Sequence, residues 1–216
     1  MQLKPASLPD LALLRRRAKS LAMLDAIMSP EWDSRYFSFN AKWGEQSQMA
    51  SMRNGEGDEW FILFGPFGAA IKGLDHESPV AQGSTFPTAM KNSLPNEFGP
   101  FLSEPAFSMD WASFCYWRGK RDVLWSQVKH PDPALAEADD GSAAYLALLV
   151  QPPGSYVEFA SGYYERDLSL TSVKQIFAHA PISQFLVNSI NPECRYAEAV
   201  EAAAEIGYPE TEETSR

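Results

Sequence analysis

The chain has 216 residues, of which 45% are hydrophobic and 21% are charged, and its formal net charge is −10. This composition is typical of a folded globular protein and excludes a chain that is disordered throughout. The excess of negative charge argues against nonspecific binding to nucleic acid, which needs a cationic surface that releases counterions from phosphate. The length favours one large domain over two small ones.

The two cysteines, Cys115 and Cys194, lie far apart and form neither a C-x-x-C metal pattern nor a disulfide framework. Such thiols suit a reducing compartment. The N-terminus lacks the order of a signal peptide, and no run of about 18 apolar residues is present to span a bilayer. We therefore expect a cytoplasmic protein that does not bind membranes.

Residues 8–28 show the clearest helical pattern, with apolar side chains at steps of three and four along one side. Ser7 offers a hydrogen-bond acceptor to the free amides at the helix start, Asp10 complements the helix dipole, and Pro30 ends the helix. The other side carries three basic residues, Arg15, Arg16 and Lys19. We interpret them as a solvated helix face, with a contact for an acidic partner or an assembly role as the alternatives.

Four segments predict an antiparallel meander. Aromatic and small polar residues alternate within residues 31–43, and residues 48–53 form a second strand. A glycine-rich turn follows, because Asn54, Gly55 and Gly57 tolerate positive φ. The next two strands are residues 59–64, whose continuous apolar run predicts a central position covered on both faces, and residues 69–74.

Residues 78–110 contain five prolines among small polar residues and predict a long surface loop, interrupted by a short helical turn near residues 95–102. Two interpretations stay open. The segment is either a lid or contact surface, or an irregular cap held by four aromatic side chains, Phe86, Phe98, Phe101 and Phe107.

Two runs of β-favouring residues within 112–128 predict a hairpin around residues 119–122. The basic residues Arg118, Lys120 and Arg121 at its tip are interpreted as a solvated turn. After an acidic link, helical periodicity predicts five segments, residues 142–150, 155–164, 169–180, 182–190 and 193–207.

Together these segments predict a single α+β domain over residues 1–207. Its antiparallel sheet has about five to six strands, with an N-terminal helix and a helical C-terminal half packed on it. Residues 208–216 are predicted to form an acidic disordered tail.

No complete catalytic or cofactor signature is present. The nucleophile elbow, the phosphate-binding loop and the dinucleotide fingerprint are all absent. His76 and Glu77 open like the zinc motif H-E-x-x-H, but Val80 stands where the second histidine is needed and Pro79 forbids a helix interior. The sequence therefore predicts no metal site and no cofactor.

Asp75, His76 and Glu77 form the densest group of acid–base side chains, at the exit of the strand over residues 69–74, the third strand of the stretch from residue 49 to residue 77. In a meander, this exit and the turn after Arg53 fall at the same end of the sheet. The candidate binding residues are Arg53, Asp58, Glu59, Lys72, Asp75, His76 and Glu77. We expect Lys72 on the same face as His76, and we expect Asp75 and His76 not to pair closely. The alternative is structural, with the loop triplet hydrogen-bonded to backbone or to Arg53.

Several phrases resemble known families. "WDSRYFSFNAKW", "MASMRNGEGDEWFILF", "AAIKGLDHESP", "EPAF" and "FCYWR" are similar to stretches of a bacterial family of uncharacterised proteins. This resemblance implies bacterial origin and transfers no catalytic residue. "LPNEFGPFL" is similar to the leucine-proline helix start of cytosolic immunity proteins of the SMI1/KNR4 type, which implies an acidic α+β domain that binds toxins.

Two functions remain open. One is an intracellular acidic domain that binds another protein, basic if electrostatics steers it, such as a toxin that it neutralises. The other is a hydrolase that uses Asp75, His76 or Glu77, with Arg53 as an anion holder. An enzyme needs a concave pocket where these side chains converge, whereas a binding domain needs a broad carboxylate-rich face.

Overall fold

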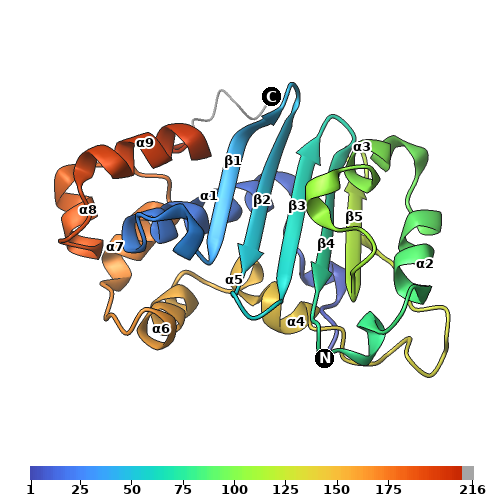
Figure 1. Cartoon of the computed structure of the whole chain (residues 1–216). Helices are drawn as coiled ribbons and strands as arrows, with labels where there is room; N and C mark the ends of the chain where they lie inside the picture. The colour runs from blue at the N-terminus through green and yellow to red at the C-terminus, as the bar shows by residue number, and fades with distance from the viewer. Residues whose placement is uncertain (211–216) are drawn as a thin grey trace.

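The computed structural model describes residues 1–210. Within this part of the chain, six antiparallel strands form one sheet in the order β1-β2-β3-β4-β5-β6, and helices lie on both sides of it (Figure 1). This architecture confirms the predicted α+β fold. The strands are β1 (Phe37–Gly44), β2 (Ser47–Arg53), β3 (Glu59–Gly65), β4 (Gly68–Leu74), β5 (Phe114–Gly119) and β6 (Ser126–Gln127). The α-helices are α1 (Leu11–Met28), α2 (Thr85–Ser93), α3 (Gly99–Leu102), α4 (Ser142–Tyr145), α5 (Ala147–Val150), α6 (Gly154–Tyr163), α7 (Leu170–Phe177), α8 (Gln184–Ile190) and α9 (Tyr196–Ile206).

Strand β3 lies inside the sheet and is buried on both faces, as its apolar run predicts. Trp60, Ile62 and Phe64 belong to the core cluster on one face. Phe61 and Leu63 belong to the cluster on the other face. All five side chains alternate in this way because successive residues of a strand point to opposite faces. None of them is more than 6% exposed.

The first face is covered by α1 and by the helices after residue 141. Helix α1 begins at Leu11 because the carboxylate of Asp10 accepts a hydrogen bond from the Leu13 amide at 2.8 Å. The predicted capping role of Ser7 is therefore wrong, since Ser7 ends a separate 3-10 turn, Pro5–Ser7. The helix ends at Met28, and Ser29 and then Pro30 follow it.

The basic side of α1 is not solvated as predicted, because the chain's own C-terminal segment covers it. Lys19 is 4% exposed, and its ammonium donates to the Gly207 carbonyl at 3.1 Å. Arg15 Nε lies 2.8 Å from the carboxylate of Glu210. Tyr208 and Glu210 are 6% and 7% exposed. The predicted tail is therefore wrong for residues 208–210, and its remainder lies outside the described residues.

The second face is covered by the segment between β4 and β5. The prediction of a structureless loop is wrong for residues 85–93, which form α2 and place Pro87 in the first turn, where its missing amide hydrogen has no helical partner to lose. The helical turn predicted near residues 95–102 is confirmed. All four predicted aromatic side chains are at most 2% exposed: Phe86, Phe98, Phe101 and Phe107. The segment is thus a packed cap.

The structure contains the remaining predicted segments in the predicted order. The hairpin is formed by β5 and β6, and each predicted C-terminal helical segment contains at least one helix. Among residues 1–210, no helix combines the length and the apolar character needed to cross a membrane.

Candidate functional site

The candidate residues meet at one end of the sheet, which we call the acidic edge and define by Glu56, Asp58, Asp75 and Glu77. Glu59 at the start of β3 pairs with Leu74 at the end of β4, so the turn before β3 and the exit from β4 lie side by side. The predicted shared edge is thereby confirmed.

Local sequence shapes the turn between β2 and β3. Gly55 and Gly57 have φ values of 80° and 114°, which side chains other than glycine rarely adopt. The side-chain oxygen of Asn54 accepts hydrogen bonds from the amides of Glu56 at 2.8 Å and Asp58 at 3.1 Å. This turn brings the Asp58 carboxylate under the segment that follows β4.

Asp58 and His76 form the centre of the site. His76 Nδ1 lies 2.7 Å from Asp58 Oδ1, and the same oxygen accepts the His76 backbone amide at 3.0 Å. The Asp58 side chain is 5% exposed, whereas that of His76 is 48% exposed. The carboxylate is therefore buried beneath an imidazole that reaches solvent.

The second oxygen of Asp58 is also satisfied. Tyr145, at the end of α4, donates its hydroxyl to Oδ2 at 2.6 Å, and Asn54 donates its amide at 2.6 Å. Burial by itself raises the pKa of Asp58, but the hydrogen bonds from Tyr145, His76 and Asn54 outweigh it, and the pKa lies below its ordinary value. Asp58 is thus a carboxylate at neutral pH.

The pKa of His76 is shifted in the direction opposite to that of Asp58. The hydrogen bond to Asp58 raises the pKa of His76 above its ordinary value, and the charge of Asp58 adds to this effect. A proton on Nδ1 that is held by the carboxylate leaves Nε2 as the nitrogen available for proton transfer or for a hydrogen bond to a partner. The pair thus has the geometry of a positioned general base. When His76 is protonated, the pair is also a fixed cation that faces solvent.

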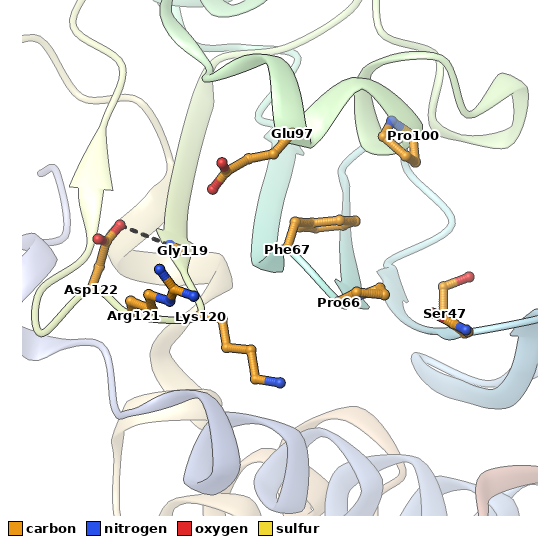
Figure 2. Close-up of a pocket in the computed structure, with 10 residues that line it drawn as sticks. Ser47, Pro66, Phe67, Glu97, Pro100, Gly119, Lys120, Arg121 and Asp122 are labelled. Carbon is orange, nitrogen blue, oxygen red and sulfur yellow. Dashed lines mark hydrogen bonds between the residues drawn. The ribbon is translucent and has the colours of Figure 1, made fainter.

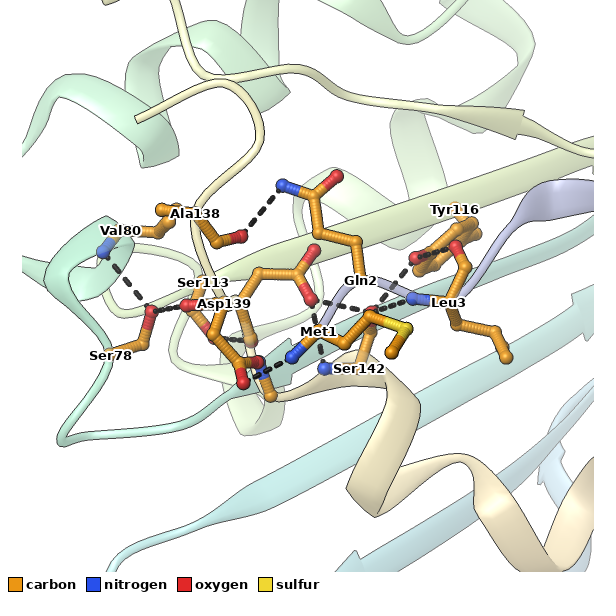
Figure 3. A network of polar contacts seen from close by, with 12 residues as sticks. Met1, Gln2, Leu3, Ser78, Val80, Ser113, Tyr116, Ala138, Asp139 and Ser142 are labelled. Atoms are coloured by element: carbon orange, nitrogen blue, oxygen red, sulfur yellow. Dashed lines mark hydrogen bonds and ion pairs between the residues drawn. The ribbon is translucent and has the colours of Figure 1, made fainter. Parts of the chain in front are cut away.

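Asp75 does not contact His76, as predicted. Its carboxylate accepts the Glu77 amide at 3.1 Å, which agrees with the structural interpretation of the triplet. Figure 3 shows how this exit segment is tied to the loop before α4, where Ser78 donates to the Asp139 carbonyl at 2.7 Å. The Asp75 amide donates to the Ser113 hydroxyl at 2.9 Å, which itself donates to the Asp140 carbonyl at 2.7 Å.

Lys72 and Glu59 lie apart from this centre. Lys72 is fully buried, and its ammonium lies 2.8 Å from the carboxylate of Glu59. The same ammonium lies 5.6 Å from the ring centre of Phe61, in the core cluster on the second face of the sheet. Burial lowers the pKa of Lys72 while Glu59 opposes this effect. The expectation that Lys72 and His76 share a face is wrong, because β4 ends at Leu74 and the chain then turns toward Asp58.

Arg53 lies at the end of β2, beside the same turn. Its guanidinium lies 5.3 Å from the ring centre of Phe61 and 5.8 Å from that of Trp32. Arg53 is among the residues predicted from the sequence, whereas Asn54 and Tyr145 are not predicted as partners of Asp58. Asn54 was interpreted only as a turn residue, and Tyr145 is 87 positions from Asp58, so no local pattern links the two.

A hollow lies at the opposite end of the sheet. It measures about 840 Å³ and lies between the turns after β1, β3 and β5 and the start of α3 (Figure 2). Its charged lining residues are Glu97, Lys120, Arg121 and Asp122. Neither this hollow nor the other three described within residues 1–210 includes Asp58 or His76. In the same part of the chain, no group of three or more histidine, cysteine or acidic side chains is arranged to hold a metal ion.

Comparison of the chain with models of protein families, with curated proteins and with solved structures finds no match. The family resemblances of the sequence analysis therefore stay predictions.

Proposed function

We propose that this protein is a binding domain that engages a basic protein partner through the acidic edge. The observation that carries the proposal is the arrangement at the end of the sheet. Glu56 and Glu77 are exposed, Asp75 is half-buried, and none of these carboxylates forms an ion pair with another side chain of residues 1–210. Such unpaired carboxylates attract a cationic surface and steer its approach.

The Asp58–His76 pair gives this edge a fixed shape. Asp58 holds the backbone and the ring of His76, and Tyr145 and Asn54 hold Asp58. A surface whose side chains are already positioned loses less conformational entropy when a partner binds. The pair therefore supports recognition of a partner, in addition to the carboxylates around it.

The resemblance to immunity proteins supports a toxin as one such partner, and the resemblance to the bacterial family supports a bacterial source. We also place the protein in the cytoplasm. Both cysteines are buried as free thiols, which is the ordinary state of cysteine in a reducing compartment.

The proposal is tested with two matched double variants of the full chain. Glu56→Gln with Glu77→Gln removes two exposed charges from the acidic edge, and Glu201→Gln with Glu205→Gln removes two from α9. Each protein is immobilised and used to capture proteins from a lysate of the source cell, which are measured by quantitative mass spectrometry. The captured partner is then purified and its affinity is measured at two salt concentrations.

We expect wild type and the α9 variant to enrich the same basic protein, and the edge variant to lose at least about tenfold of its affinity, more at low salt than at high salt. Equal losses in both variants, no loss in either, or enrichment of acidic proteins only would reject the proposed edge.

The geometry of Asp58 and His76 favours one alternative, a hydrolase in which His76 acts as a general base oriented by Asp58. This alternative predicts hydrolysis of simple esters or phosphomonoesters that is lost in both His76→Ala and Asp58→Asn. Hydrolysis that persists unchanged in these two variants would exclude it.

A further inference from the structure

A small hollow beside the acidic edge has a different chemistry from the edge itself. This hollow, which we call the Arg53 hollow, measures about 240 Å³. It lies where the end of β2 meets the segment before β1 and the end of α6. Its walls include Trp32, Arg35, Tyr36, Ser51, Arg53 and Tyr163.

Arg53 supplies a positive charge that no carboxylate of residues 1–210 neutralises. Glu59 is its direct partner in the sheet register, but the Glu59 carboxylate is held by Lys72 at 2.8 Å. The guanidinium lies over the rings of Phe61 and Trp32, which hold it by cation–π contact. A guanidinium that stacks on aromatic faces keeps its in-plane N–H groups for a ligand.

Polar groups from the sheet lie beside Arg53. Ser51 lines the hollow and is only 4% exposed, and Ser38, also in the lining, pairs with it across β1 and β2. Serine hydroxyls are donors that complement an anionic oxygen. A guanidinium and a hydroxyl are both donors to an anionic oxygen, and the guanidinium adds charge assistance.

The charge of the hollow selects a monoanion. Its charged residues are Arg35, Arg53 and Asp33, and two cations with one anion leave a net charge of +1. Arg35 is already engaged, because its guanidinium donates to the carbonyls of Ser29 at 3.0 Å and Pro30 at 2.9 Å. One free guanidinium matches a carboxylate, whereas a phosphate monoester carries about −1.5 to −2 charges at neutral pH.

The remaining walls select the body of the ligand. Trp32 and Tyr163 are 50% and 44% exposed, and the rings of Tyr36 and Tyr163 lie 5.0 Å apart. Exposed aromatic side chains next to an arginine are typical of the residues that dominate binding energy. Since Tyr36 and Tyr163 are in edge-to-face contact with each other, a flat apolar group stacks on the exposed ring of Trp32 or Tyr163 rather than between two rings.

We propose that the Arg53 hollow binds a monocarboxylate carried on a flat, apolar body, with Arg53 as the charge partner and Ser51 and Ser38 as hydroxyl donors. The source is either a free aromatic acid or the carboxyl end of a peptide. The larger hollow of Figure 2 makes no such selection, because the charges of Lys120 and Arg121 are balanced there by Glu97 and Asp122.

The test uses benzoate and benzamide, which have nearly the same shape and differ in charge. Each is titrated into the ¹⁵N-labelled full chain, and amide and indole shifts are followed by NMR. We expect benzoate to shift the signals of Trp32, Ser51 and Gly55, and benzamide to bind at least about tenfold more weakly. A short peptide that ends in phenylalanine, with a free or an amidated carboxyl end, then separates a peptide source from a free acid.

Two arginine variants complete the experiment. Arg53→Gln should lose about tenfold or more of the benzoate affinity, while Arg121→Gln, at the opposite end of the sheet, should bind as wild type does. Arg53→Lys keeps the charge without the fork and should also bind weakly, which guards against a folding defect in one variant. Equal binding of benzamide, inorganic phosphate binding more tightly than benzoate, benzoate shifts confined to residues 118–122, or unchanged binding in Arg53→Gln would each overturn the proposal.

Discussion

Two buried aspartates, Asp25 in α1 and Asp58 at the acidic edge, have similar contacts, but their pKa values are shifted in opposite directions. Asp25 is fully buried, and it accepts the Tyr156 hydroxyl at 2.6 Å and the Phe37 amide at 2.6 Å. Asp58 also accepts a tyrosine hydroxyl at 2.6 Å and a backbone amide at 3.0 Å. Yet burial raises the pKa of Asp25 to about 6, whereas the pKa of Asp58 is lowered.

The difference comes from the depth at which each carboxylate lies. Asp25 lies inside the first core, where desolvation outweighs its hydrogen bonds. Asp58 lies at the end of the sheet, where its hydrogen bonds, including those from Asn54 and His76, outweigh the effect of burial. Burial alone therefore does not decide whether a carboxylate is charged. Asp25 therefore joins helix α1 to strand β1, whereas Asp58 organises a surface.

The largest effect is expected for Asp25→Ala. The substitution leaves two buried donors, the Tyr156 hydroxyl and the Phe37 amide, without a partner, and each such loss costs about 1–3 kcal/mol. We expect the free energy of unfolding at neutral pH to fall by about 4 kcal/mol. Urea denaturation followed by circular dichroism measures this change. A loss below about 1 kcal/mol would show that the two donors find other partners.

The raised pKa of Asp25 should also be visible in the pH dependence of the free energy of unfolding. The pKa of Asp25 is raised from 3.8 to about 6 in the folded protein, so the folded state binds more protons than the unfolded state between these values. The contribution of Asp25 to the free energy of unfolding therefore decreases as the pH rises from about 4 to about 6, by about 3 kcal/mol. Asp25→Asn cannot titrate and should lack this decrease. Identical slopes for the two proteins would contradict the raised pKa.

Asp58 should give the opposite slope and a smaller loss. Its pKa is lowered in the folded state, so its contribution to stability is present above the ordinary value of 3.8 and is lost as the pH falls below it. Asp58→Asn should lower the free energy of unfolding at neutral pH by about 2 kcal/mol, because one oxygen acceptor is lost. The variant should also be less sensitive to acid than wild type. Chemical denaturation at a series of acidic pH values tests both statements, and an unchanged acid profile would count against them.

The smallest effect is expected at His76, which reaches solvent. The pKa of His76 is raised by Asp58, so whatever stability the pair provides is complete below the ordinary value of 6.5 and is lost as the pH rises through the folded-state value. An NMR titration of the imidazole should give a pKa above 6.5 in wild type and a lower one in Asp58→Asn. His76→Ala should fold normally with almost unchanged stability. A large loss of stability in that variant would mean that His76 is chiefly structural.

The sequence alone predicted the fold class, the meander and the end of the sheet where the candidate residues lie. It did so because period-two and period-3.6 patterns, glycine turns and an apolar strand are local signals. It also placed Arg53, Asp58 and His76 at one edge, since antiparallel strands return the chain to the same end.

Only the tertiary structure decided which of these residues meet. Tyr145 reaches Asp58 from α4, and Glu210 neutralises the basic side of α1 from beyond α9; such contacts between distant positions leave no periodic trace in one sequence. The structure also separated Lys72 from His76, because β4 ends at Leu74 before the alternation of faces reaches His76. Asp25 and Asp58 are the same residue type in the sequence, and their pKa values are shifted in opposite directions because the balance of desolvation and hydrogen bonding depends on three-dimensional packing.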